Sequence, residues 1–158
     1  MRKNLLMSSL LLCAATSMWG QPAFASENWV GTWKLNAAKS TFGSAAVARA
    51  QTLKFEATAA GIKLTSEGTD PQGKPMQGQY TSKFDGKDVA WTGNPLADMA
   101  CPKRIDDNSY ENVWKNGGKA TMTARVVVSD HNKTLTITQT PTDAQRAAAS
   151  SVAVYDRQ

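Results

Sequence analysis

The chain of 158 residues has the length of one folded domain and is too short for two well-buried cores. Hydrophobic residues make up 41% of it and charged residues 20%, which is typical of a globular domain and not of a disordered tail. The net charge of +5 is spread along the chain, which argues against a nucleic-acid-binding protein. A single histidine and two cysteines exclude most metal sites and most histidine-dependent catalysis.

The first 25 residues have the pattern of an export signal. Arg2 and Lys3 precede an apolar stretch over residues 5–19, and Ala23-Phe24-Ala25 supplies the small–x–small pattern of a cleavage site. The apolar stretch is too short for a membrane span, and no later window has the roughly 18 apolar residues that a span needs. We therefore expect a signal peptide over residues 1–25 and a mature domain over residues 26–158, in the bacterial periplasm or outside the cell.

Cleavage at this site would remove Cys13 and leave Cys101 as the one cysteine of the mature chain, so no intramolecular disulfide is expected. A lone thiol in an oxidising compartment can react or pair between chains. We interpret Cys101 instead as a small buried hydrophobic residue.

Ten runs of residues alternate between apolar and polar side chains, with turn residues between them, and this pattern predicts β-strands. The runs cover residues 29–35, 53–57, 62–65, 80–84, 89–91, 101–105, 110–115, 122–128, 134–138 and 152–155. Asn116-Gly117-Gly118 can supply the positive φ angles of a tight hairpin. Two Ala-rich segments lack the alternation. Residues 36–50 could hold a short helix around residues 45–49, and residues 142–151 predict a helical turn or a long loop.

The fold class that follows is all-β. A barrel closes the edges of such a sheet, and one of about 8–10 strands is wide enough to keep a cavity. The short connections between successive strands favour an antiparallel up-and-down barrel, with a two-sheet sandwich as the alternative. No linker or low-complexity segment divides residues 26–158.

Gly31-Thr32-Trp33, in the first predicted strand, resembles the Gly-x-Trp signature of lipocalins and fatty-acid-binding proteins. The resemblance implies a barrel whose base is closed by Trp33 beside Gly31, with Arg157 over the tryptophan ring in a cation–π contact. Fatty-acid-binding proteins also carry an arginine near the C-terminus that clamps a carboxylate, and this chain has Ala153 there. The chain also resembles a group of small secreted bacterial proteins without an assigned activity, in segments such as Phe84-Asp85-Gly86-Lys87.

Candidate catalytic groups are few. His131 lies in a predicted turn, and without a second histidine no Ser-His-Asp or Cys-His arrangement can be completed. We expect no catalytic site, no metal site and no cofactor. The carboxylate pairs Asp85/Asp88 and Asp106/Asp107 lie in predicted turns and are interpreted as solvated.

Five aromatic residues on predicted strands are the candidates for lining a ligand site: Phe55, Tyr80, Phe84, Trp91 and Trp114. Concave apolar sites use aromatic side chains together with a few polar groups, although the same residues could simply fill a core. Arg104 and Arg125 are the arginines on strands that could anchor a polar group, but the alternation turns Arg125 outward.

The first hypothesis is an exported lipocalin-like barrel that binds a small apolar or amphipathic molecule, with the segment 36–50 as a partial lid. The alternative is a non-enzymatic envelope interaction or structural module with a filled barrel and an exposed apolar patch. An enzyme that uses carboxylates or Cys101 is the third. The sequence does not indicate the oligomeric state or the ligand.

Overall fold

The computed structural model describes residues 27–43, 50–70, 72–129 and 131–158. The predicted signal peptide and the helix expected at residues 45–49 lie outside these ranges. The described part of the chain forms ten strands: β1 (Gly31–Leu35), β2 (Ala50–Thr58), β3 (Gly61–Thr69), β4 (Pro75–Ser82), β5 (Val89–Ala90), β6 (Met99–Arg104), β7 (Ser109–Asn116), β8 (Lys119–Ser129), β9 (Thr134–Pro141) and β10 (Ser151–Arg157). Two short 3-10 helices, η1 (Ala37–Lys39) and η2 (Ala144–Ala149), complete the fold.

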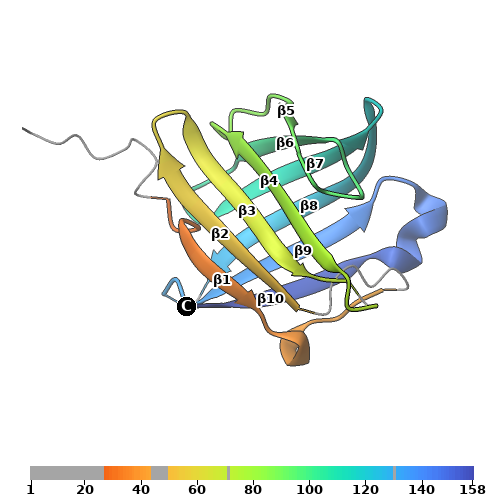
Figure 1. Ribbon diagram of the computed structural model, residues 1–158, viewed down its shortest axis with the longest axis horizontal. Coiled ribbons are helices and arrows are strands. Elements are labelled where there is room, and N and C mark those ends of the chain that lie inside the picture. Colours follow the sequence, from red (N-terminus) through yellow and green to blue (C-terminus); the bar gives the residue numbers. More distant parts are fainter. Residues whose placement is uncertain (1–26, 44–49, 71, 130) are drawn as a thin grey trace, which may run out of the picture.

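All ten strands form one antiparallel sheet in the order β4-β3-β2-β1-β10-β9-β8-β7-β6-β5. The first and last strands pair with each other, so the sheet curls round on itself (Figure 1). Its two edges, β4 and β5, meet where the backbones of Gln79 and Thr92 exchange hydrogen bonds of 2.9 and 3.0 Å. The predicted all-β up-and-down barrel is confirmed, nearly closed, and the sandwich alternative is wrong.

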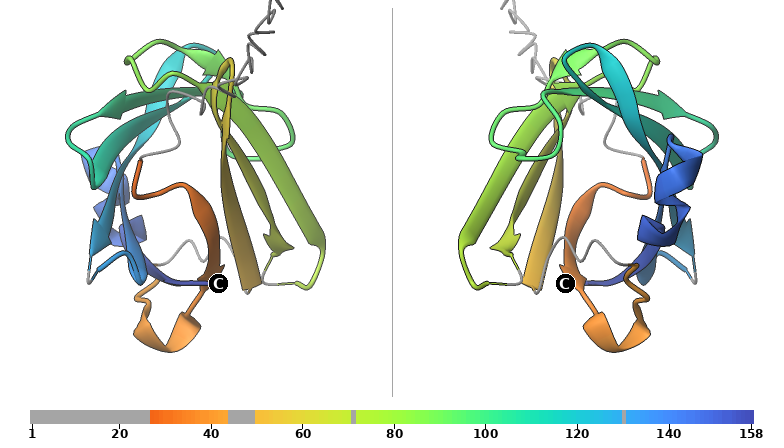
Figure 2. Two further views of the ribbon diagram at one scale, coloured as in Figure 1. Left: turned by 90° about the vertical axis from the view of Figure 1, so that its left-hand side faces the viewer. Right: turned by 90° about the vertical axis from the view of Figure 1, so that its right-hand side faces the viewer.

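The strand connections fall into two sets, one at each end of the barrel. We call the base the end that holds residues 27–30, the connections β2–β3, β4–β5, β6–β7 and β8–β9, and the end of β10. We call the mouth the opposite end, where the connections β1–β2, β3–β4, β5–β6, β7–β8 and β9–β10 lie. The base is at the left of Figure 1 and the mouth at the right. Figure 2 shows the wall formed by β1–β4 facing the wall formed by β7–β10.

The period-two pattern decides which side chains face inward, because successive residues of a strand point to opposite faces of the sheet. On β8, Ala124 and Val126 are buried, whereas Arg125 between them is exposed, as predicted. The hairpin from β7 to β8 turns at Gly117 and Gly118, whose φ angles are +56° and +79°. These are the positive angles that the Asn-Gly-Gly sequence was expected to supply.

Helical structure is limited to single turns in the described residues. The segment 36–50 contains η1, which begins before the helix expected at residues 45–49, and the Asn36 side chain accepts a hydrogen bond from the backbone N–H of Lys39 at 3.2 Å. The second non-alternating segment contains η2. No helix in the described ranges has the length and apolar character needed to cross a lipid bilayer.

Candidate ligand-binding chamber

Trp33 closes the barrel at its base, with Gly31 and Arg157 beside it. The ring of Trp33 is fully buried, and the guanidinium carbon of Arg157 lies 4.9 Å from its centroid. Gly31 has a φ of +141°, and a Cβ atom there would lie 2.8 Å from a guanidinium nitrogen of Arg157. Only glycine combines this backbone angle with room for the arginine. The contact that the lipocalin resemblance implied is therefore present.

Aromatic side chains fill the space above the base. Trp29 is fully buried and packs against Phe84 and Tyr110, with ring centroids 5.8 and 5.4 Å apart. Phe84 itself meets Tyr110 edge-on at 4.7 Å. Phe84 was expected among the ligand-lining residues, but it lies in this base cluster and outside the lining of the cavity. The reason is local: β4 ends at Ser82, and Phe84 has a φ of +57°, so strand alternation no longer applies to it.

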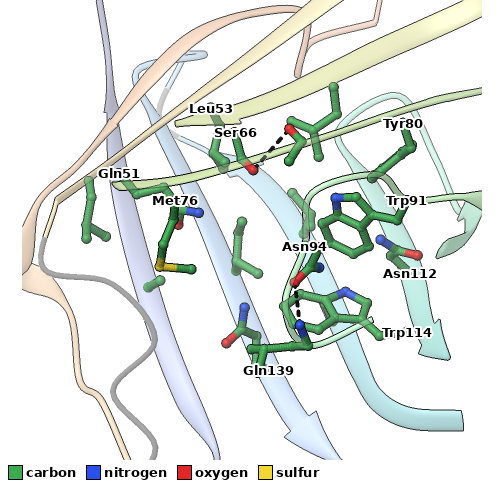
Figure 3. Close-up of a pocket in the computed structure, with 18 of the residues that line it drawn as sticks. Gln51, Leu53, Ser66, Met76, Tyr80, Trp91, Asn94, Asn112, Trp114 and Gln139 are labelled. Atoms are coloured by element: carbon green, nitrogen blue, oxygen red, sulfur yellow. Dashed lines mark hydrogen bonds between the residues drawn. The ribbon is translucent and has the colours of Figure 1, made fainter. Parts of the chain in front are cut away.

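The upper half of the barrel holds a cavity of about 90 Å³, which we call the chamber. Four of the five predicted aromatic residues line it: Phe55, Tyr80, Trp91 and Trp114. Trp91 packs edge-on against both Tyr80 and Trp114, each with a centroid distance of 5.1 Å. Figure 3 shows the two indoles beside one another on one side of the chamber.

The chamber adjoins a larger recess of about 770 Å³ at the mouth, and Met76, Trp114 and Gln139 line both. The rim of this recess comes from the connections at the mouth end and carries the charged residues Asp70, Lys74 and Arg146. The interior is therefore filled at the base and open at the mouth. Phe42, from the segment expected to form a partial lid, lines the chamber, and residues 44–49 of that segment lie outside the described residues.

Polar side chains also line the chamber, and strand alternation alone did not single them out. Gln51 accepts a hydrogen bond from the Tyr155 hydroxyl at 2.6 Å, and Gln139 accepts one from Ser151 at 3.0 Å. The Asn112 side chain, 3% exposed, accepts one from the backbone N–H of Cys101 at 3.0 Å. These contacts hold the amide groups against the wall.

The described residues that line the chamber include no lysine, arginine, histidine, aspartate, glutamate or cysteine. Its titratable groups are the phenols of Tyr80, Tyr110 and Tyr155, and burial raises the pKa of each. Their hydroxyls are therefore neutral at physiological pH. Ala153, at the position of the carboxylate-clamping arginine of fatty-acid-binding proteins, lines the chamber with a methyl group.

Neither candidate arginine anchor reaches the chamber. Arg125 is exposed on the outer face of β8. Arg104 lies at the base, where it forms salt bridges with Glu27, at 2.9 Å, and with Asp107. Glu27 is 7% exposed, and burial, partly offset by Arg104, raises the pKa of its carboxyl group.

Cys101 is half-buried on β6 between the buried residues Ala100 and Pro102, so the interpretation of it as a buried residue is wrong. Alternation turns its side chain to the outer face of the sheet, where its thiol donates to the Gly86 carbonyl oxygen at 3.1 Å. Burial, together with the nearby Asp88 carboxylate, raises the pKa of the thiol. The thiolate is therefore disfavoured, and with it nucleophilic chemistry at this position.

The remaining candidates for catalysis are solvent-exposed. His131 is an exposed turn residue with a φ of +56°. Asp85 and Asp88 pair with Lys87 and Lys115, respectively. In the described ranges, no cluster of three or more His, Cys, Asp or Glu side chains could hold a metal ion.

Some residues that line the chamber were not predicted from the sequence. A sequence pattern could have identified those on strands but not those in loops. Tyr110 and Asn112 share the parity of Trp114 on β7, so alternation could have placed both in the interior. Asn94, Pro95 and Leu96 reach the chamber from the connection between β5 and β6. A loop has no period, so no pattern in the sequence marks these three residues.

No protein-family model and no curated protein sequence matches the chain. Among solved structures, a de novo designed fluorescence-activating β-barrel aligns with a TM-score of 0.42 and 11% identity, over 85% of this chain and 97% of that one. A biogenic amine-binding protein aligns with a TM-score of 0.45 and 16% identity, over 82% of this chain and 63% of that one. At these TM-scores, neither likeness indicates what this barrel binds.

Proposed function

We propose that this chain is an exported, lipocalin-like barrel that binds a small apolar or amphipathic molecule in the chamber and the recess beside it at the mouth. The observation that carries the proposal is the contrast between the two halves of the interior. The base is filled by aromatic side chains, whereas the upper half holds a cavity beside a recess of about 770 Å³ at the mouth. Concave, mostly apolar cavities with a few placed polar groups are the usual form of small-molecule sites.

A binding role fits the chamber better than an enzymatic one. General acid–base catalysis needs a group whose pKa lies near the working pH, and nucleophilic catalysis needs an activated nucleophile. Burial raises the pKa of the tyrosines that line the chamber, which keeps them protonated. Cys101, on the outer face, is directed at a backbone carbonyl.

The alternative, an interaction module with a filled barrel, has less support. Its mark would be a contiguous exposed apolar patch. The large hydrophobic residues exposed in the described ranges are Leu96, Ile105 and Val152. They lie in the β5–β6 connection, after β6 and on β10, so they belong to different regions of the surface.

The export part of the proposal has its own support in the sequence. Arg2, Lys3, the apolar stretch and Ala23-Phe24-Ala25 form the complete pattern of a secretory signal. Mass measurement of the protein recovered from the periplasm or medium of an expressing bacterium tests it. A measured mass equal to that of residues 26–158 supports export. An uncleaved product that stays in the cytoplasm contradicts it.

Native mass spectrometry of the exported protein, purified without detergent, tests the binding function. We expect a bound mass of small-molecule size that disappears when the protein is denatured. The Ala124→Leu variant, which adds a side chain inside the chamber, should lose this mass. Arg125→Leu places the same side chain on the outer face and should retain it.

A protein that carries no bound mass is then tested with the fluorescent probe N-phenylnaphthylamine. Probe uptake should be lost in Ala124→Leu and kept in Arg125→Leu. This result would show that the chamber is a binding site whose ligand was lost during purification. A protein with no bound mass and no uptake of the probe would contradict the proposed function.

A further inference from the structure

One wall of the chamber carries four polar side chains close together in the fold, which we call the donor wall: Trp91, Asn94, Asn112 and Trp114. Trp91 follows β5 directly, Asn94 lies in the connection to β6, and the other two residues lie on β7. Figure 3 shows all four on the same side of the chamber.

The two tryptophans of the donor wall have unused hydrogen-bond donors. Trp91 is 9% exposed and Trp114 is 8% exposed, and the Nε1 atom of each is buried without a hydrogen-bond partner among the described residues. An indole nitrogen can only donate, and the aromatic faces beside it are weak acceptors. Buried polar groups in folded proteins usually have a partner, so these two N–H groups can donate to an acceptor that enters the chamber.

The two asparagines also present donors, because their oxygens are already used. The Asn94 side-chain oxygen accepts from the backbone N–H of Leu96 at 2.9 Å, and that of Asn112 accepts from the backbone N–H of Cys101 at 3.0 Å. A backbone N–H can only donate, so it must face the oxygen of each amide and not the nitrogen. The NH₂ group is then what each asparagine offers to a ligand.

The chamber as a whole disfavours a charged ligand. Its described lining contains no side chain that is ionised at physiological pH. A carboxylate or an ammonium group would leave water for a cavity without an opposite charge, which is costly. The charged residues Asp70, Lys74 and Arg146 lie at the mouth.

We propose that the chamber selects an uncharged, flat aromatic molecule that carries a carbonyl or a similar acceptor. This inference rests on the proposed binding function. The acceptor faces the donor wall and receives hydrogen bonds from one or two of its indole and amide nitrogens. The aromatic body is larger than the chamber of about 90 Å³, so it extends past Trp114 into the recess at the mouth.

Three probes with one naphthalene ring separate these requirements: acetylnaphthalene carries a carbonyl, isopropylnaphthalene has the same shape without an acceptor, and naphthoate carries a negative charge. Their affinities for the protein expressed from the full chain are measured by equilibrium dialysis. The readout is the ratio of the acetyl to the isopropyl affinity, compared between variants, because the difference in hydrophobicity between these two probes then cancels. We expect naphthoate to bind more weakly than acetylnaphthalene.

The variant Trp114→Phe keeps an aromatic ring but removes one donor, so the ratio should fall by roughly threefold to tenfold. Trp91→Phe should give a fall of similar size. Trp29→Phe is the matched control, because its indole N–H is also buried without a partner but belongs to the base and does not line the chamber. This control should leave the ratio unchanged.

The possible results separate this inference from the proposed function. If acetyl- and isopropylnaphthalene bind but neither chamber variant changes their ratio, the donor wall does not select an acceptor and this inference is wrong, while the proposed function stands. Tightest binding of naphthoate would overturn the requirement for an uncharged ligand. If none of the three probes binds, this inference is wrong, and the proposed function then stands or falls by the bound mass and the uptake of N-phenylnaphthylamine.

Discussion

The Arg157 side chain holds the base of the barrel together through uncharged partners. Its guanidinium group donates to the backbone carbonyl oxygens of Val30 at 2.7 Å, Asn28 at 3.2 Å and Asn132 at 3.3 Å. The same group lies over the ring of Trp33. One side chain thus ties the start of the described chain, the β8–β9 turn and the plug of the base to the end of β10.

Replacing this group should lower the stability of the fold. Arg157→Met keeps the aliphatic part of the side chain but removes the donors and the charge. We expect the free energy of unfolding in urea to fall by about 1–2 kcal/mol, a modest value because the arginine is exposed. Arg125→Met, at an exposed position on β8, should change it by less than about 0.5 kcal/mol. Equal losses in both variants would show that the base contact does not stabilise the barrel.

At the scale of single elements, the sequence predicts strands well and the limits of strands poorly. The alternation around Arg125 correctly separates its two faces because the side-chain period of a strand is two. Phe84 breaks the rule because the strand has ended and the backbone has turned to a positive φ angle. Asn94 escapes prediction because a loop residue is placed by tertiary contacts. The aromatic residues of the chamber could therefore be predicted from the sequence, whereas the donor Asn94 could not.

The junction between β4 and β5 is the weakest joint of the sheet. It is held by the isolated bridge between Gln79 and Thr92, whereas β2 and β3 pair continuously over nine residues each. An isolated pair of hydrogen bonds can open without breaking its neighbours, and a continuous ladder cannot. The backbone amide of Thr92 should therefore exchange with deuterium at least about tenfold faster than that of Leu53 in β2, measured by NMR. Equally slow exchange would mean that this junction is as firmly closed as the rest of the barrel.

At the scale of the whole molecule, the barrel divides its interior between stability and binding. The base holds fully buried residues such as Trp29, Trp33 and Leu135, which lie outside the chamber lining. The upper half is lined by residues such as Leu64 and Ile137, which are also buried but border the chamber. Close packing at the base supplies dispersion and hydrophobic free energy that an open cavity does not.

Two identical substitutions in the two halves test this division. Leu135→Ala creates a sealed void at the base, and it should cost about 3–5 kcal/mol of unfolding free energy without changing the affinity for acetylnaphthalene. Leu64→Ala enlarges a chamber that is open to the mouth, so water can enter the new space and the cost should be lower, about 2 kcal/mol. It should also change the affinity for the probe, because Leu64 lines the chamber. Urea unfolding and equilibrium dialysis on both variants give the two quantities. The division fails if both variants lose stability and affinity alike, since the interior would then behave as one continuous core.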